Sequence, residues 1–265
     1  MNKDKVTIFK IGGDIIENDE KLTSFLQSLV KIKGKKILVH GGGKIASEIS
    51  LNLGIKPKMV EGRRLTDFES LKVMIMVYGG LINKSIVARL QGLKQACIGL
   101  TGADLATINA KKRVNETYDY GYVGDIESVD STYIMQFIEQ GILPVFSPLS
   151  FDSQGQLLNT NADTIASSIA QALSPHYRVD LAFCFDLPGV LEDPNDKQSL
   201  IGTLSETRFK KEKADGHISA GMVPKLENGF AALKSGVEKV IVTSSQATSA
   251  LELGNPMKGT ELCLD

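Results

Sequence analysis

The sequence contains little of the equipment on which many enzymes and small secreted proteins depend. Its 265 residues include three cysteines, three histidines and no tryptophan. Because the cysteines and histidines are scattered along the chain, we expect neither a Cys/His zinc site nor a disulfide framework. No apolar run approaches ~20 residues, so we expect neither a membrane span nor a signal peptide.

An excess of charge is also absent. The 30 Lys and Arg residues nearly balance the 31 Asp and Glu residues, which leaves a formal net charge of −1. Such a balance argues against a protein built to coat nucleic acid or a membrane surface. We therefore expect a cytoplasmic protein whose chemistry comes from Lys, Arg, Asp and Asn side chains and from backbone N–H groups.

What the chain does contain is a regular alternation of short apolar runs and longer amphipathic segments. This alternation predicts an α/β fold with a mostly parallel sheet and helices on both faces. Two helices are expected near 66–78 and 81–93, and hairpins are expected between 107 and 126. A boundary near residue 175 separates an N-terminal lobe (1–175) from a C-terminal lobe (176–265). The expected strands are 6–11, 36–40, 96–100, 142–146, 180–185 and 240–243, and further helices are expected over 20–32, 44–53, 131–140, 163–173 and part of 221–235.

Glycine clusters follow the first two predicted strands. Gly12 and Gly13 end the first strand, and Gly41, Gly42 and Gly43 end the second. Glycine lets backbone N–H groups approach an anion closely, and the N-terminus of the following helix adds partial positive charge. Because both loops open at the carboxyl edge of one sheet, they predict an anion site there.

Lys10 stands one residue before the end of the first apolar strand. A buried lysine is costly unless an anion pairs with it, so its position also favours an anion site; the alternative is that its side chain points to solvent.

The second glycine loop has another interpretation. Gly41-x-Gly43-x-x-Ala46, with Glu61 about 20 residues further on, fits a dinucleotide fingerprint, so an NAD-binding oxidoreductase remains an alternative.

Polar side chains cluster before the predicted helix at 163–173. Asn161 and Asp163 suit an N-cap and a first helical turn, but capping does not account for Asn159, and the three groups together suit a small polar ligand. Arg64 lies at the end of a predicted hairpin. Its planar guanidinium matches a carboxylate, with a solvated surface position as the alternative.

In order along the chain, these motifs and two more resemble the amino acid kinase family, from residue 6 to residue 260. The resemblance implies a three-layer αβα sandwich around an open, mainly parallel eight-stranded sheet, with an amino-acid substrate in the N-terminal lobe and ATP in the C-terminal lobe. The motifs are Lys10-Ile-Gly-Gly, His40-Gly-Gly-Gly, Gly62-x-Arg64-x-Thr66, Asn159-x-Asn161-Ala-Asp163, Asp186-x-x-Gly189-Val-Leu and Gly221-Met-x-x-Lys225.

The resemblance also implies roles for individual residues. Lys10 and Lys225 contact the transferring phosphoryl group, and Asp163 holds both lysines in place. Substrate binding falls to Gly42, Gly43, Arg64, Asn159 and Asn161, and nucleotide binding to Gly12, Gly13, Asp186, Gly189, Leu191, His217 and Ser219. Mg²⁺ is expected to be held by phosphate oxygens and water, with no protein ligand named.

The activity implied by the resemblance is ATP-dependent phosphorylation of the γ-carboxylate of N-acetyl-L-glutamate, in arginine biosynthesis. Arg63 departs from the apolar residue common in the family, which leaves N-succinyl-L-glutamate as an alternative substrate. Another amino acid kinase and a non-catalytic nucleotide sensor are more distant alternatives.

Arginine-regulated members of the family carry an extra N-terminal helix, whereas here the first strand starts almost at once. We therefore expect a homodimer without arginine feedback.

Overall fold

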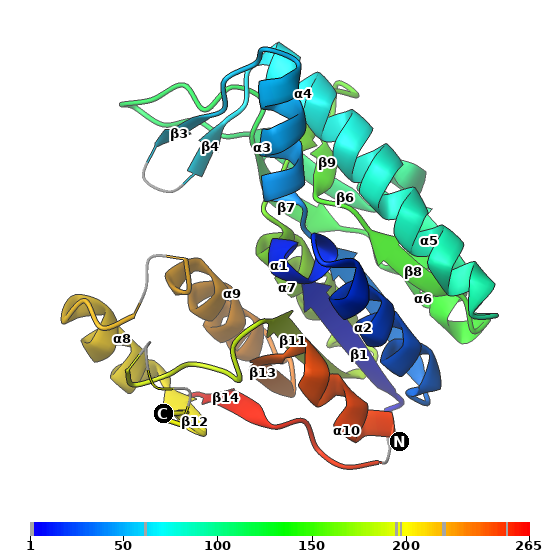
Figure 1. Cartoon of the computed structure of the whole chain (residues 1–265), viewed down its shortest axis with the longest axis vertical. Helices are drawn as coiled ribbons and strands as arrows, with labels where there is room; N and C mark the ends of the chain where they lie inside the picture. Colours follow the sequence, from blue (N-terminus) through cyan, green and yellow to red (C-terminus); the bar gives the residue numbers. More distant parts are fainter. Residues whose placement is uncertain (1–2, 61–62, 194–195, 197, 219–220, 253) are drawn as a thin grey trace.

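The computed structural model describes residues 3–60, 63–193, 196, 198–218, 221–252 and 254–265. Within these residues, one sheet has eight strands, and its one antiparallel pair is β13–β14, so that β14 and β12 run opposite to the other six (Figure 1). The predicted open, mainly parallel sheet is confirmed. Its order is β12 (Thr203–Ser205), β14 (Gly259–Cys263), β13 (Lys239–Ser244), β11 (Arg178–Phe185), β1 (Lys5–Ile11), β2 (Lys35–His40), β8 (Leu143–Phe146) and β5 (Cys97–Leu100).

Helices cover both faces of this sheet and bury a separate apolar core on each, as the predicted sandwich requires. Strand alternation divides β1 between them, because Val6 and Ile8 enter one core while Phe9 and Ile11 enter the other. The first core is covered by α6 (Thr132–Glu139), α7 (Ala162–Leu173), α8 (Glu206–Ala214) and α9 (Val223–Lys234). The second is covered by α1 (Gly13–Ile16), α2 (Asp19–Lys31), α3 (Gly43–Asn52), α4 (Phe68–Met74), α5 (Asn83–Gly92) and α10 (Ser249–Glu252).

Two smaller groups of strands lie beyond the carboxyl edge of the large sheet (Figure 1). One is the hairpin of β3 (Lys58–Val60) and β4 (Arg63–Leu65), which was predicted. The other is a four-stranded sheet, of which the β6–β7 hairpin was predicted and the remaining pair was not. Its order is β10 (Leu157–Asn159), β9 (Leu149–Phe151), β6 (Ile108–Lys112) and β7 (Gly124–Val129).

The two helices predicted at 66–78 and 81–93 are one continuous helical segment. Asp67 caps its start by accepting a hydrogen bond from the Ser70 N–H, and a π-helical stretch, η1 (Ile75–Ile82), joins α4 to α5. Because it is continuous, Phe68–Gly92 is the one helix in the described chain that is long and apolar enough to cross a membrane. Core helices of globular proteins can have the same length and composition. In an apolar 18-residue stretch of this helix, 44% is buried inside the molecule.

The large sheet runs through both predicted lobes. β1 pairs on one side with β2, from the first lobe, and on the other with β11, from the second. A division near residue 175 therefore falls immediately before a central strand, and it stays a prediction.

Candidate functional site

The two glycine loops lie side by side, as their positions after successive strands predicted. Ile11 and His40 are register partners at the ends of β1 and β2, and the Gly41 N–H donates to the Ile11 carbonyl over 3.0 Å. Gly42 has a φ of +141°, and a Cβ placed there would lie 2.2 Å from Cδ1 of Ile82. The loop conformation at Gly42 therefore requires glycine, both for its backbone angle and for its close approach to η1.

A fully buried imidazole, that of His40, is hydrogen-bonded to this loop. His40 Nδ1 lies 2.8 Å from the Gly41 carbonyl oxygen, and its Nε2 lies 3.2 Å from Nδ2 of Asn83. Because a carbonyl only accepts, Nδ1 carries the proton and Nε2 accepts from the amide. Asn83 Nδ2 also donates to the Val145 carbonyl over 2.9 Å. Burial lowers the pKa of His40 to about 4, so the imidazole is neutral at pH 7.

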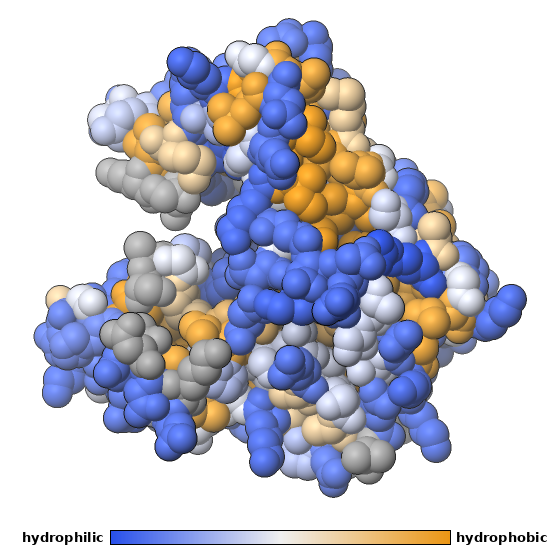
Figure 2. All heavy atoms as spheres, in the orientation of Figure 1, coloured by the Kyte–Doolittle hydropathy of each residue, from blue (hydrophilic) through white to orange (hydrophobic). Residues whose placement is uncertain are grey.

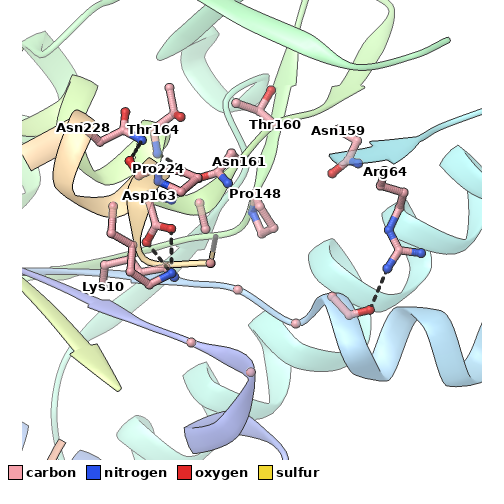
Figure 3. Close-up of a pocket in the computed structure, with 18 of the residues that line it drawn as sticks. Lys10, Arg64, Pro148, Asn159, Thr160, Asn161, Asp163, Thr164, Pro224 and Asn228 are labelled. Carbon is pink, nitrogen blue, oxygen red and sulfur yellow. Dashed lines mark hydrogen bonds and ion pairs between the residues drawn. The ribbon is translucent and has the colours of Figure 1, made fainter. Parts of the chain in front are cut away.

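Three charged side chains meet next to the glycine loops. The Asp163 carboxylate forms two ion pairs (Figure 3). Its Oδ1 lies 2.7 Å from Nζ of Lys10, and its Oδ2 lies 3.1 Å from Nζ of Lys225. Lys10 comes from β1, on the strand face that α7 covers, whereas Asp163 and Lys225 come from the first turns of α7 and α9. The predicted grouping of these three residues is confirmed as geometry; their roles stay a prediction.

Burial and charge act against each other in this cluster. The side chains of Lys10 and Asp163 are 7% and 5% exposed. Burial lowers the pKa of Lys10, although the Asp163 carboxylate opposes that change. Burial alone would raise the pKa of Asp163, but Lys10 and Lys225 together hold it below its usual value. The carboxylate is therefore ionised at neutral pH and shared between two ammonium groups.

Arg64, which lies on the β3–β4 hairpin, contacts the second glycine loop. Its Nη2 donates to the Gly43 carbonyl over 3.0 Å and to Oγ of Ser47 over 2.5 Å, which fixes the guanidinium against the start of α3. Its Nη1 is buried and has no hydrogen-bond partner among the described residues. A buried, unpartnered guanidinium nitrogen is the donor that an incoming carboxylate would satisfy.

The predicted capping of α7 is confirmed. Asn161 accepts hydrogen bonds through Oδ1 from the N–H groups of Asp163 and Thr164, at 2.7 and 3.1 Å. Asn159 is not part of the cap; its Nδ2 donates to Oγ1 of Thr66 over 3.0 Å, which ties β10 to the end of the hairpin.

These groups line one cavity of about 760 Å³. Figure 2 shows the molecule hollowed on this side, between the β3–β4 hairpin and α9. The N-termini of α3, α7 and α9 contribute Gly43, Ala162 and Pro224 to its wall, so three helix dipoles present their positive ends to it. Of the predicted site residues, the cavity brings together Lys10, Gly12, Gly13, Gly42, Gly43, Arg64, Asn159, Asn161, Asp163 and Lys225.

Comparison with known proteins agrees with this geometry. The model of the amino acid kinase family matches residues 5–244. The chain is 50% identical over 261 residues to an acetylglutamate kinase of Cytophaga hutchinsonii, covering 97% of this chain and 98% of that protein. It is 49% identical over 245 residues to an acetylglutamate kinase of Bacteroides fragilis, with 92% and 94% covered. The chain belongs to the amino acid kinase family.

Among solved structures, smu.665 from Streptococcus mutans UA159 has the same fold as this amino acid kinase. Its TM-score is 0.81 at 23% identity, and 98% of this chain and 99% of that chain are covered. Membership of the family makes the chain a kinase and implies ATP as its co-substrate. The dinucleotide interpretation of Gly41–Ala46 is therefore wrong: the second glycine loop belongs to a kinase.

The other residues assigned to the nucleotide in this amino acid kinase do not line the cavity described above. Asp186 pairs with Lys21 at 2.6 Å, and His217 pairs with Glu212 at 2.9 Å. Gly189 and Leu191 pack beside Leu200; a Cβ on Gly189 would lie 2.6 Å from Oγ1 of Thr260, and Leu191 forms a bridge with Leu200. Ser219 lies outside the described residues. Their assignment to the nucleotide stays a prediction.

Several polar side chains of the site were missed from the sequence, among them Ser47 and Tyr78. Ser47 follows Gly43 by four residues on the same face of α3, so helical spacing was a signal for it. Tyr78 lines the cavity from η1. Its sequence neighbours gave no signal, because a π-helical turn changes which residues face inward.

The stability of the protein should depend on pH through His40. Burial lowers its pKa from 6.5 to about 4, so between these values the unfolded chain binds a proton that the folded chain does not. This contribution to the free energy of unfolding is intact above pH 6.5 and is lost as the pH falls to 4, a change of about 3 kcal/mol.

The change should be visible by urea unfolding at pH 7 and pH 4.5. His40→Gln removes the titrating group, so its free energy of unfolding should fall less between the two pH values than that of the wild type. The exposed His176 gives the control, because His176→Gln should keep the wild-type pH dependence. An identical fall in wild type and His40→Gln would contradict the assignment.

Proposed function

We propose that this kinase transfers the γ-phosphoryl group of ATP to the γ-carboxylate of N-acetyl-L-glutamate, giving N-acetyl-L-glutamyl 5-phosphate and ADP, as a step of arginine biosynthesis. The observation that carries the proposal is the arrangement of cations in one cavity. Figure 3 shows Arg64 on one side and Lys10 with Asp163 on the other. Arg64 has a guanidinium nitrogen without a partner among the described residues, and Lys225 shares Asp163 with Lys10. The acetylglutamate kinases that share about half of the residues of this chain support the same substrate.

The reaction needs no base from the protein. A γ-carboxyl group with a pKa of about 4.3 is ionised at neutral pH and is already a nucleophile. One of its oxygens forms the new bond to the γ-phosphorus, while the bond from that phosphorus to the bridging oxygen of ADP breaks. His40, the histidine beside the second glycine loop, is fully buried and bonded to Gly41 and Asn83, so it is not placed to take a proton.

The protein contributes alignment and charge. Phosphoryl transfer depends mostly on holding the groups in line and on stabilising negative charge on the equatorial oxygens. Lys10 and Lys225 supply ammonium groups for that charge, and Asp163 fixes the position of both. The N–H groups of Gly42 and Gly43, at the N-terminus of α3, offer further donors to the phosphoryl group and substrate.

The amino-acid end of the substrate lies toward the hairpin in this proposal. Arg64 clamps the α-carboxylate, with Asn159 and Asn161 nearby. Met59, Val123 and Pro148 line the same cavity and suit an acetyl methyl group. In the proposed division of the chain, residues 1–175 bind the amino acid and residues 176–265 bind ATP, with the transferring group between them.

Mg²⁺ accompanies ATP in the proposed mechanism. Both carboxylate oxygens of Asp163 face lysine ammonium groups, so this side chain is not free to bind a metal. Among the described residues, no three His, Cys, Asp or Glu side chains form a group that could hold a metal ion. We therefore assign the metal to phosphate oxygens and water, where it would neutralise charge on the phosphates.

N-succinyl-L-glutamate is the second candidate substrate. Arg113 lines the cavity and would attract an acidic acyl group. It already pairs with Asp125, however, through Nε contacts of 3.0 and 3.2 Å, which is why the acetyl substrate is placed first. The side chain of Arg63, on which the alternative was based, lies outside what the structure describes.

We also propose that the protein is a cytoplasmic homodimer. Figure 2 shows apolar side chains gathered over α4 and η1. Leu51, Met76 and Leu81 are each more than half exposed on α3 and η1. Burying these side chains against a second copy would remove a contiguous apolar patch from water.

The direct test measures ADP formation with ATP, Mg²⁺ and either acyl substrate. We expect turnover that depends on N-acetyl-L-glutamate and a kcat/KM at least about tenfold lower for N-succinyl-L-glutamate, because a charged acyl group finds no unpaired cation at Arg113. The opposite preference would give the reaction to the second candidate. ATP binding without turnover on either acid would contradict the proposal.

Lys225→Ala should lower kcat about a hundredfold while changing the KM for N-acetyl-L-glutamate little, because the ammonium group is assigned to charge that develops in the transition state. Steady-state kinetics gives both constants. Lys234→Ala, which removes an exposed lysine from the same helix, is the matched control. An unchanged kcat in Lys225→Ala would remove this residue from the chemical step.

Arg64→Ala should act on binding. We expect the KM for N-acetyl-L-glutamate to rise at least about thirtyfold, as is usual when one partner of a buried charge pair is removed, while the KM for ATP stays near the wild-type value. Arg208→Ala, which removes an arginine paired with Glu192 outside the cavity, should leave both constants unchanged. A rise confined to the KM for ATP would show that the clamp is misassigned.

A further inference from the structure

Tyr78 reaches the cavity from an unusual backbone. It lies in η1, the π-helical stretch between α4 and α5, where each turn holds more residues than in an α-helix. Tyr78 and Asn83 stand five residues apart, and both are buried toward the glycine loop. The wider turn therefore places Tyr78 beside the loop while Asn83 contacts His40 beneath it.

The aromatic ring and the hydroxyl group of Tyr78 have different surroundings. The ring packs against the loop, because Cδ1 and Cε1 would lie 3.4 Å from a Cβ built on Gly42. The side chain lines the cavity, yet the residue is only 4% exposed. No hydrogen bond joins the hydroxyl to any residue that the structure describes. Phenylalanine would pack equally well, so packing does not explain the hydroxyl group.

A tyrosine hydroxyl that borders the cavity without a partner among the described residues is a donor available to a ligand. Burial raises the pKa of Tyr78, which the Arg64 charge only partly offsets, so the group is protonated at neutral pH and able to donate. Its surroundings within the protein thus leave one donor to be satisfied by whatever enters the cavity.

The space that this donor faces is also the space that Arg64 faces. A Cβ built on Gly43 would lie 3.9 Å from Nη2 of Arg64 and 4.0 Å from Oη of Tyr78, and no other atom outside the immediate chain comes within 4 Å of it. The guanidinium and the phenol therefore border the same side of Gly43, and a ligand oxygen with negative charge suits a space bordered by both.

We propose that the Tyr78 hydroxyl is a further substrate-binding group, which donates a hydrogen bond to the carboxylate clamped by Arg64. The inference rests on the proposed function, because it takes the α-carboxylate of an N-acylglutamate as the group bound there. It adds a second donor from a different element, so that the carboxylate is held between the hairpin and η1.

Tyr78→Phe tests the hydroxyl alone, because the ring that packs on Gly42 is kept. We expect the KM for N-acetyl-L-glutamate to rise roughly tenfold, the effect of one hydrogen bond to a charged group, with kcat and the KM for ATP within about twofold of wild type. Tyr177→Phe is the matched control. Its hydroxyl is bonded to Glu139 at 2.5 Å, away from the cavity, so its loss should leave every kinetic constant unchanged.

A ligand lacking the α-carboxylate tests which group the hydroxyl contacts. 4-Acetamidobutanoate is N-acetylglutamate without that carboxylate, and its inhibition constant against N-acetyl-L-glutamate can be measured for both proteins. If Tyr78 contacts the α-carboxylate, wild type and Tyr78→Phe should bind this analogue equally. A tenfold loss for the analogue as well would overturn the assignment, and so would an unchanged KM for N-acetyl-L-glutamate.

The two proposals fail differently. If wild type turns over N-acetyl-L-glutamate and Tyr78→Phe has the same KM, only the role of Tyr78 is lost. If wild type neither phosphorylates an N-acylglutamate nor binds one by calorimetry, the proposed function is lost, and the contact with its α-carboxylate is overturned with it.

Discussion

One carboxylate shared by two ammonium groups is the interaction on which the site depends. Asp163 joins three separate elements, since Lys10 comes from the central strand β1 and Lys225 from α9. Removing Asp163 would leave two ammonium groups uncompensated in a region from which water is largely excluded, whereas removing either lysine would leave one neutral ion pair. The three groups together carry one net positive charge, so the cluster is electrostatically complete only when an anion approaches it.

The remaining features extend that positive field across the cavity. Three helix N-termini point into it, and the guanidinium of Arg64 is fixed on the side away from the lysines. A substrate with carboxylates at both ends can therefore satisfy both groups of cations at once, whereas a shorter acid can satisfy only one. The scarcity of histidine and cysteine agrees with such a site, because a nucleophile that is already ionised needs charge and alignment rather than a base.

The sequence was sufficient for the parts of the fold that obey regular periods. The central strands and the glycine loops were predicted, and neighbouring parallel strands bring such loops together. Other elements lacked a signal. α8 is mostly charged, with Phe209 as its one buried side chain, and β14 alternates only over Gly259–Cys263. Tyr78 could not be found by counting, because η1 departs from the 3.6-residue period on which helical patterns rely.

The central position of β1 has a consequence for the order in which the protein is made. β1 is synthesised before both of its partners; β2 follows soon after it, but the partner on its other side is β11, at Arg178–Phe185. The strand that carries Lys10 therefore keeps an open edge until most of the chain has left the ribosome. Such distant pairing is slow and leaves unpaired backbone available for aggregation. Lys225 comes later still, so a nascent chain can order its glycine loops well before it possesses a charge cluster to place beside them.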